Sequence, residues 1–232
     1  MKKYRKFGYK GLAEIYVKAR KEGYSRTYDS MCKIIRKMKG NAKEKPKKLH
    51  KRKKKIEQAK YPGERVQIDI KYVPEECIQF GTRDQKYYQI KALDEYTRKR
   101  VLRIVDEKST YQTAKFLENL KKELGFNIKK VQTDNGKEFT NSESDKKTLF
   151  ELKLEEKGIE YGTIRPYSPW ENGKVERSHR LDSKYYADKK FKSKEELLRS
   201  IKKYNTRYNN ISRKVLGFKS PNEVLKEYKE NH

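Results

Sequence analysis

The sequence predicts an α/β domain in which helices pack against a mixed sheet. Three stretches, 65–73, 87–94 and 99–106, alternate apolar and polar residues with the two-residue period of strands. Further along, stretches with the apolar spacing of helices alternate with shorter strand-like ones. Strands followed by alternating helices and strands are typical of an α/β domain built around one sheet.

Each element rests on its own pattern. In 65–73, Val66, Ile68 and Ile70 share one face, and charged turns separate the next two strand-like stretches, which favours an antiparallel meander. The elements expected after the meander are a helix at 113–125 ended by Gly125, a strand at 128–134, a helix at 149–158, a strand at 159–164, a long helix from about Asn172, and two helices within 191–232.

Residues 11–40 predict two short helices separated near Gly23. This is the pattern of a helix-turn-helix, and an ordinary basic helical hairpin explains it equally well. The second helix carries basic side chains suited to a DNA groove, namely Arg26, Lys33 and Arg36.

The chain is expected to divide into four parts. A helix-turn-helix-like module spans 1–40, a core spans 62–190, and a helical extension of the core spans 191–232. Between module and core, residues 41–61 lose the apolar pattern and read as a basic linker that contacts phosphates, through residues such as Lys51, Arg52 and Lys53.

The charge of the chain indicates a polyanionic partner. Lys and Arg number 61 against 33 Asp and Glu, which gives a net charge of +28. Many Lys and Arg contacts to phosphates add up, so nucleic acid is the expected partner. The sequence has no apolar run long enough to span a membrane and no signal-peptide pattern, so we expect a chain without a membrane partner, located in the cytoplasm. Its two cysteines and three histidines have no zinc-site spacing.

Three carboxylates stand out by position. Asp69 lies in the middle of a strand, where Asp is disfavoured, and points away from the apolar face. Asp134 ends a strand and precedes the turn pair Asn135-Gly136. Glu176 lies one turn into the long helix. Each alone is explained as a solvated side chain, a turn residue or an exposed helix glutamate.

Taken together, the three acids suit metal-dependent phosphoryl chemistry. Carboxylates are acceptor-only oxygen ligands, which fit a pair of Mg²⁺ or Mn²⁺ ions. Two such ions can clamp the attacking and leaving oxygens of an in-line displacement at phosphorus. Other acids near strand ends or the following loop compete for this role, namely Asp94, Asp106, Glu138 and Glu171, and for Asp94 and Asp106 a strand-end charge is the favoured reading.

Four strings carry a family resemblance: VQIDIKYVP, KALDEYTRKRV, VQTDNGKEFT and IRPYSPWENGKVERSHR. Their order and spacing resemble those of DDE transposases of bacterial insertion sequences, in the retroviral-integrase catalytic core superfamily. The tail strings SKEELLRSIKKYNTRYNN and LGFKSPNEVL are similar to the segment after the catalytic glutamate in those enzymes. The resemblance runs from about Tyr61 to Leu225.

The resemblance implies an RNase-H-like integrase core, with a five-stranded mixed sheet flanked by helices. It implies that Asp69, Asp134 and Glu176 are the catalytic metal ligands for two Mg²⁺ or Mn²⁺ ions. Glu171 would shorten the interval after Asp134, but it precedes the NGK string, whereas the family's glutamate follows it. Many relatives carry a basic residue seven positions beyond the glutamate, and here that position is Ser183.

The activity implied is that of a transposase: cleavage of transposon ends followed by strand transfer into target DNA. The partners would be double-stranded DNA and further copies of the chain in a dimer or larger assembly, in a bacterial, nucleoid-associated setting. The alternatives are a simple nuclease on the same fold, a non-catalytic DNA-binding protein derived from a transposase, and a structural basic protein. Retention of all three acids argues against a non-catalytic derivative, and the ordered motifs argue against a structural protein.

Residues around the acids are expected to contact DNA. The long helix repeats basic side chains beside Glu176, which suits phosphate contacts, at Lys174, Arg177, Arg180 and Lys184. Trp170, in the loop before this helix, either stacks on an unpaired base or packs on the core. His179 is expected to make an ordinary hydrogen bond and has no catalytic role in this interpretation.

Overall fold

The computed structural model describes residues 11–38, 58–82, 84–141, 146–165 and 169–232. The chain forms two compact units, one of residues 57–209 and one that combines residues 1–56 with 210–232. Most of the predicted linker, with Lys51, Arg52 and Lys53, lies outside the described residues. The four predicted domain boundaries therefore stay predictions.

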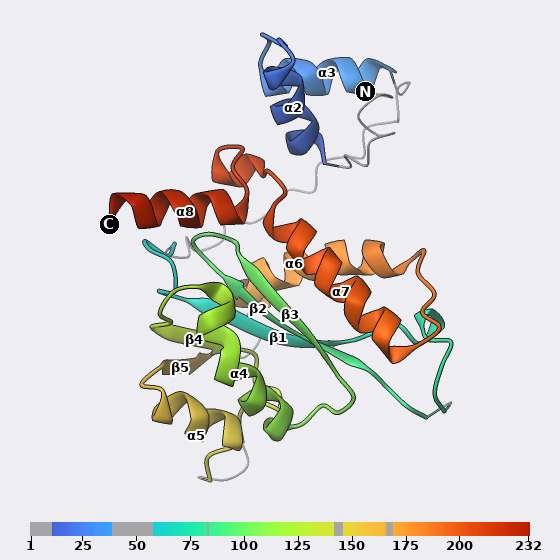
Figure 1. Cartoon of the computed structure of the whole chain (residues 1–232). Helices are drawn as coiled ribbons and strands as arrows, with labels where there is room; N and C mark the ends of the chain where they lie inside the picture. The colour runs from blue at the N-terminus through green and yellow to red at the C-terminus, as the bar shows by residue number, and fades with distance from the viewer. Residues whose placement is uncertain (1–10, 39–57, 83, 142–145, 166–168) are drawn as a thin grey trace. The chain divides into compact units, whose positions relative to one another are not determined.

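The larger unit contains the predicted five-stranded mixed sheet, with strand order β3-β2-β1-β4-β5 (Figure 1). The strands are β1 (Val66–Tyr72), β2 (Tyr88–Asp94), β3 (Arg100–Val105), β4 (Lys130–Thr133) and β5 (Glu160–Thr163). The first three pair antiparallel as the predicted meander, and β4 pairs parallel to both β1 and β5. The sheet order puts β1 in the centre, between β2 and β4.

Helices cover both faces of this sheet (Figure 1). They are α4 (Thr110–Leu124) and α5 (Leu149–Glu156) on one face, and α6 (Gly173–Tyr186) and α7 (Lys194–Asn209) on the other. The α4 and α5 side holds the main apolar core, in which Val66 and Ile68 of β1 pack against Phe116 and Phe150. The opposite face carries the polar side chains of β1, because successive side chains of a strand alternate between faces.

The helix ends follow the sequence closely. The side chain of Ser109 caps α4 by accepting from the backbone N–H of Gln112, and α4 ends at Gly125 with a φ of 82°, as predicted. Thr148 and Glu151 form a capping box at the start of α5. None of the described helices is long and apolar enough to cross a membrane.

The smaller unit contains the two predicted N-terminal helices, α2 (Leu12–Lys21) and α3 (Tyr28–Met38), together with α8 (Pro221–Asn231) and the 3-10 turn η3 (Lys214–Leu216). The ring of Phe218, just after η3, packs on Tyr16 and Tyr28, with ring centroids 4.9 and 5.2 Å apart. Lys214 pairs with Asp29 at 3.1 Å. Aromatic contacts therefore join the end of the chain to the N-terminal helices.

Candidate active site

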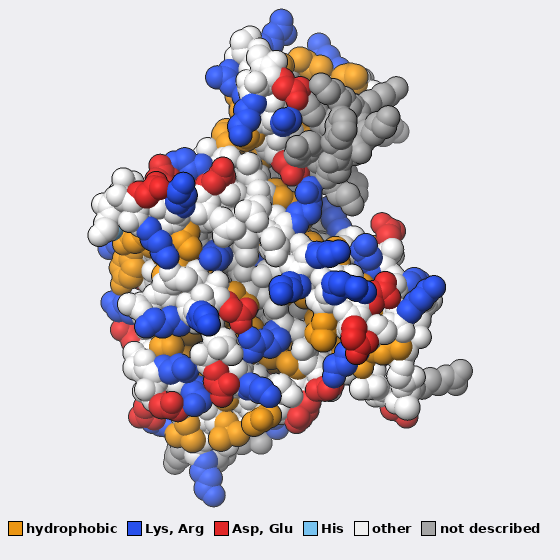
Figure 2. Space-filling view, viewed as in Figure 1, with side chains coloured by type: hydrophobic (Ala, Val, Ile, Leu, Met, Phe, Trp, Pro, Cys, Tyr) orange, Lys and Arg blue, Asp and Glu red, His pale blue; other side chains and the backbone are white. Residues whose placement is uncertain are grey.

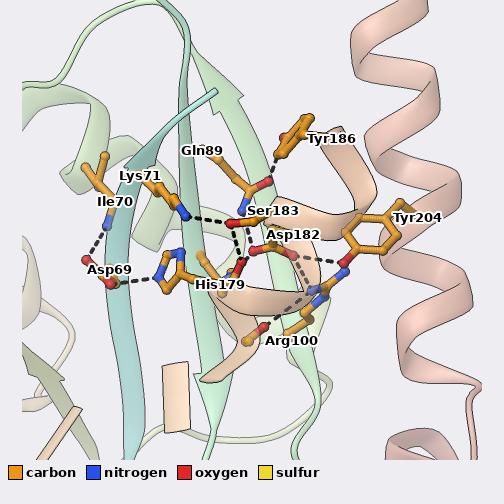
Figure 3. Close-up of polar contacts among 12 residues, drawn as sticks. Asp69, Ile70, Lys71, Gln89, Arg100, His179, Asp182, Ser183, Tyr186 and Tyr204 are labelled. Carbon is orange, nitrogen blue, oxygen red and sulfur yellow. Dashed lines mark hydrogen bonds and ion pairs between the residues drawn. The ribbon is translucent and has the colours of Figure 1, made fainter. Parts of the chain in front are cut away.

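Asp69 lies in the middle of β1 on the face opposite the apolar core. Its side chain is 19% exposed. Oδ2 lies 2.7 Å from Nε2 of His179 on α6, and Oδ1 accepts a hydrogen bond from the backbone N–H of Ile70 (Figure 3). The strand therefore presents this carboxylate toward α6, at the edge of solvent.

Asp134 directly follows β4, the strand that runs parallel beside β1. Val66 pairs with Val131 and Gln67 with Gln132, an offset of 65 positions that puts residue 134 level with residue 69. The backbone N–H of Gly136 donates to Oδ1 of Asp134. Burial and the nearby negative charge of Asp69 raise the pKa of Asp134, which is the behaviour of two carboxylates that share one site.

Glu176 lies in the first turn of α6 and is exposed. The start of α6 is fixed on β1 by Gln67, whose side-chain oxygen accepts from the backbone N–H of Val175. Glu176 and His179 are three positions apart in the sequence, so the two lie on neighbouring positions of one helix face. Within the described part of the chain, no three His, Cys, Asp or Glu side chains are grouped closely enough to hold a metal ion.

The other acids that compete for metal binding are engaged elsewhere. Glu171 is paired with Arg165, whose Nε lies 2.7 Å from Oε1. Asp94 is buried and accepts from the backbone of Gly63 and from Thr97, and Asp106 is paired with Lys194. Glu138 is paired with Lys108 at 2.9 Å, and its charge is one of those that raise the pKa of Asp134.

The predicted DNA-contacting residues fall into two groups. Arg177, Arg180 and Lys184 are exposed on α6, whereas Lys174 forms an ion pair with the buried Glu95. In the smaller unit, Lys33 and Arg36 are exposed on α3, and Arg26 is exposed just before α3 begins. Lys and Arg side chains, with acids between them, are spread over the face shown in Figure 2. Trp170 lies in the 3-10 turn η2 (Pro169–Asn172), but its side chain is outside the described set.

A buried charged cluster behind the site was missed by the sequence interpretation. Asp182 of α6 forms an ion pair with Arg100 of β3 at 2.9 Å (Figure 3). It forms a second ion pair with Lys91 of β2, and the side chains of both cations are fully buried. Burial opposes ionisation of Asp182, but the two cations hold its pKa below the ordinary value. Burial also lowers the pKa of Lys91 to about 8. Lys91 is the cross-strand partner of Asp69, so this cluster fixes α6 directly beside Asp69.

The hydrogen bond predicted for His179 is made with Asp69, a candidate metal ligand, and it joins α6 to β1. Replacing His179 by Ala should reduce the DNA cleavage that the family resemblance implies by about 10- to 100-fold, the usual effect of losing a side chain that orients a ligand. The measurement is the cleavage rate with Mg²⁺ present. His232→Ala, at an exposed tail position, is the control and should cleave normally. A His179→Ala variant as fast as wild type would show that this hydrogen bond is not needed.

Comparison with protein families gives two overlapping matches. Two models, each described as an integrase core domain, match residues 59–169 and 157–213. The matched region thus begins before β1 and runs past α7, and it includes all three candidate acids.

A curated relative and several solved structures are also similar. A putative integrase of Spiroplasma virus SpV1-C74 is 33% identical in a 173-residue alignment that covers 69% of this chain and 47% of that relative, so the chain spans about half the relative's length. A chain of the simian T-cell lymphotropic virus intasome has a TM-score of 0.58 at 19% identity, covering 96% of this chain and 73% of that chain. The integrase catalytic core of HTLV-2, solved with magnesium, has a TM-score of 0.53 at 18% identity, covering 72% of this chain and 99% of that one.

Proposed function

Because this chain belongs to the integrase core domain family, we propose that it is a transposase that cuts DNA ends and joins them to target DNA. The observation that carries the proposal is that two carboxylates lie close together on adjacent strands. Asp69 and Asp134 stand at the same level of adjacent parallel strands, and the charge of one raises the pKa of the other. The helix that carries Glu176 is fastened to the same face by Gln67 and by the Asp182 cluster.

The acids fit divalent cations by their chemistry. Carboxylate oxygens accept and do not donate, which suits Mg²⁺ and Mn²⁺, and a cation between Asp69 and Asp134 would relieve their mutual repulsion. Glu176 would complete the set, and its exposure leaves the side chain room to turn toward the pair. A pair of such ions, when bound, would activate the attacking oxygen and stabilise the leaving oxygen at phosphorus. The magnesium in the HTLV-2 core structure supports this assignment by analogy.

The remaining roles belong to side chains around these acids. His179 would orient Asp69, and the backbone N–H of Gly136 would orient Asp134. Arg177, Arg180 and Lys184 would bind phosphates on either side of the cut, which positions the strand without reading its sequence. The attacking group in such a design is water or a DNA 3′ hydroxyl, so no covalent bond between DNA and protein forms.

The proposed partners are double-stranded DNA, as element ends and as target, and further copies of the chain. The net charge of +28 favours DNA. Joining two ends to one target also needs two active sites, which favours a dimer or larger assembly. The intasome in which one structural relative was solved is consistent with this arrangement.

The test is whether the chain joins DNA as well as cutting it. The wild-type chain is incubated with Mg²⁺, a labelled duplex carrying the inverted repeats that flank its coding region, and a supercoiled target. We expect labelled duplex to become covalently joined to target, and EDTA to prevent it. Cutting without any joining would favour the simple nuclease, and DNA binding without cutting would favour the non-catalytic alternative.

A further inference from the structure

A lysine beside the candidate ligands has no role in the function proposed above. Lys71 lies two residues after Asp69 on β1, so both side chains are on the sheet face that α6 covers. Its Nζ donates a hydrogen bond to Oγ of Ser183 on α6, at 3.0 Å (Figure 3). Ser183 in turn donates to the backbone carbonyl of His179, at 3.1 Å. The ammonium group is therefore held at a defined point between strand and helix.

The position of this ammonium group relative to the acids follows from regular geometry. Glu176 and Ser183 are seven positions apart on α6, which is about two turns and roughly 10 Å along its axis. Asp69 and Lys71 are about 7 Å apart along the strand. One strand of duplex DNA advances about 3.4 Å per phosphate, so these two distances correspond to about two and about three nucleotides.

The chemistry of the Lys71 ammonium group at this position suits phosphate binding. A lysine ammonium has three N–H donors, and its hydrogen bond to Ser183 leaves two for phosphate oxygens. The lysine is half-buried, so its stem is packed and less of its freedom is lost on binding. Arg180 and Lys184 are exposed on the neighbouring positions of α6, which extends positive charge along the same edge.

We propose that Lys71 and Ser183 form a phosphate-binding site that holds the cut DNA strand about two to three nucleotides from the bond that is broken. The site rests on the proposed function, because it assumes that DNA crosses the face that carries Asp69. In this arrangement Lys71 is a positioning residue, since it fixes the strand and does not touch the reacting phosphate. The other explanation of its hydrogen bond is that it only packs α6 on β1.

The experiment removes the charge either from a DNA phosphate or from Lys71. The position at which wild-type protein cuts a short duplex is mapped first. A series of this duplex is then prepared, in which each member carries one neutral methylphosphonate in place of one phosphate near the cut. Binding of the full chain to each duplex is measured without divalent metal. Wild type should lose about tenfold in affinity at each phosphate that a cationic side chain contacts, including one position about two to three nucleotides from the cut. Lys71→Gln should bind the unmodified duplex about tenfold more weakly and show no further loss at that position.

Two further variants make the result specific. Lys71→Arg retains the charge and should retain the sensitivity of wild type. Lys121→Gln removes an exposed lysine from α4, on the other side of the sheet, and should behave as wild type. If Lys71→Gln keeps the full methylphosphonate penalty at every position, the phosphate site is wrong and the contact serves packing alone. A wild-type chain that neither binds nor cuts DNA would instead overturn the proposed function, and this site with it.

Discussion

Replacing Asp182 by Asn is expected to lower the free energy of unfolding by about 3–5 kcal/mol, the usual cost of breaking a buried ion pair. The substitution keeps the volume of the side chain and removes the only carboxylate that pairs, among the described residues, with both Lys91 and Arg100. Lys91 can respond by losing its proton, because its pKa is already lowered to about 8. Arg100 cannot, since a guanidinium stays charged in proteins, so most of the cost comes from this residue.

Urea unfolding of the Asp182→Asn variant, followed by circular dichroism, measures this cost. Asp188→Asn is the matched control, because Asp188 is exposed just after α6 and should change stability by no more than about 0.5 kcal/mol. Equal stability of the two variants would mean that the cluster around Asp182 is not important for the fold. A loss confined to Asp182→Asn would confirm that α6 is anchored by this cluster.

The elements of the fold were predictable because the strands and helices have clear periodicities. The alternation of Val66, Ile68 and Ile70 gives β1, and Gly125 correctly marks the end of α4. The position of β1 between β2 and β4 could not be derived from periodicity, since any one strand pattern pairs with several neighbours. The contact of Phe218 with Tyr16 and Tyr28 joins residues about 190 to 200 positions apart, and no local pattern signals it.

The candidate site was predictable only where a residue violated a local rule. Asp69 interrupts an apolar strand, and Asp134 stands at a strand end before a turn, so both attract attention from the sequence. Asp182 lies among charged residues of a helix that looks solvent-exposed, and its burial depends on how α6 packs on the sheet. Lys91 was the one signal of this cluster in the sequence, because a lysine between Ile90 and Ala92 in the middle of a strand requires a partner if the strand is buried.

Replacing any one of Asp69, Asp134 and Glu176 is expected to reduce DNA cleavage on the order of 10³-fold or more. Each of Asp69→Asn, Asp134→Asn and Glu176→Gln removes one ligand charge at nearly constant volume, and a metal site built from carboxylates depends on that charge. Binding of DNA should change little, because phosphate contacts come from Lys and Arg side chains. Glu171→Gln is the control and should remain active, since Glu171 is paired with Arg165.

The most direct measurement of the central claim is the single-turnover rate at which Asp134→Asn cuts a labelled duplex with Mg²⁺, compared with wild type at saturating protein. Saturation removes differences in DNA affinity, so the rates compare the chemical step alone. Asp134→Asn also removes the charge that Asp69 repels, so the variant should fold at least as well as wild type. We predict normal DNA binding and a cleavage rate reduced on the order of 10³-fold or more. A variant that binds DNA and cuts it at the wild-type rate would contradict the account, because the paired acids would then not be the catalytic site.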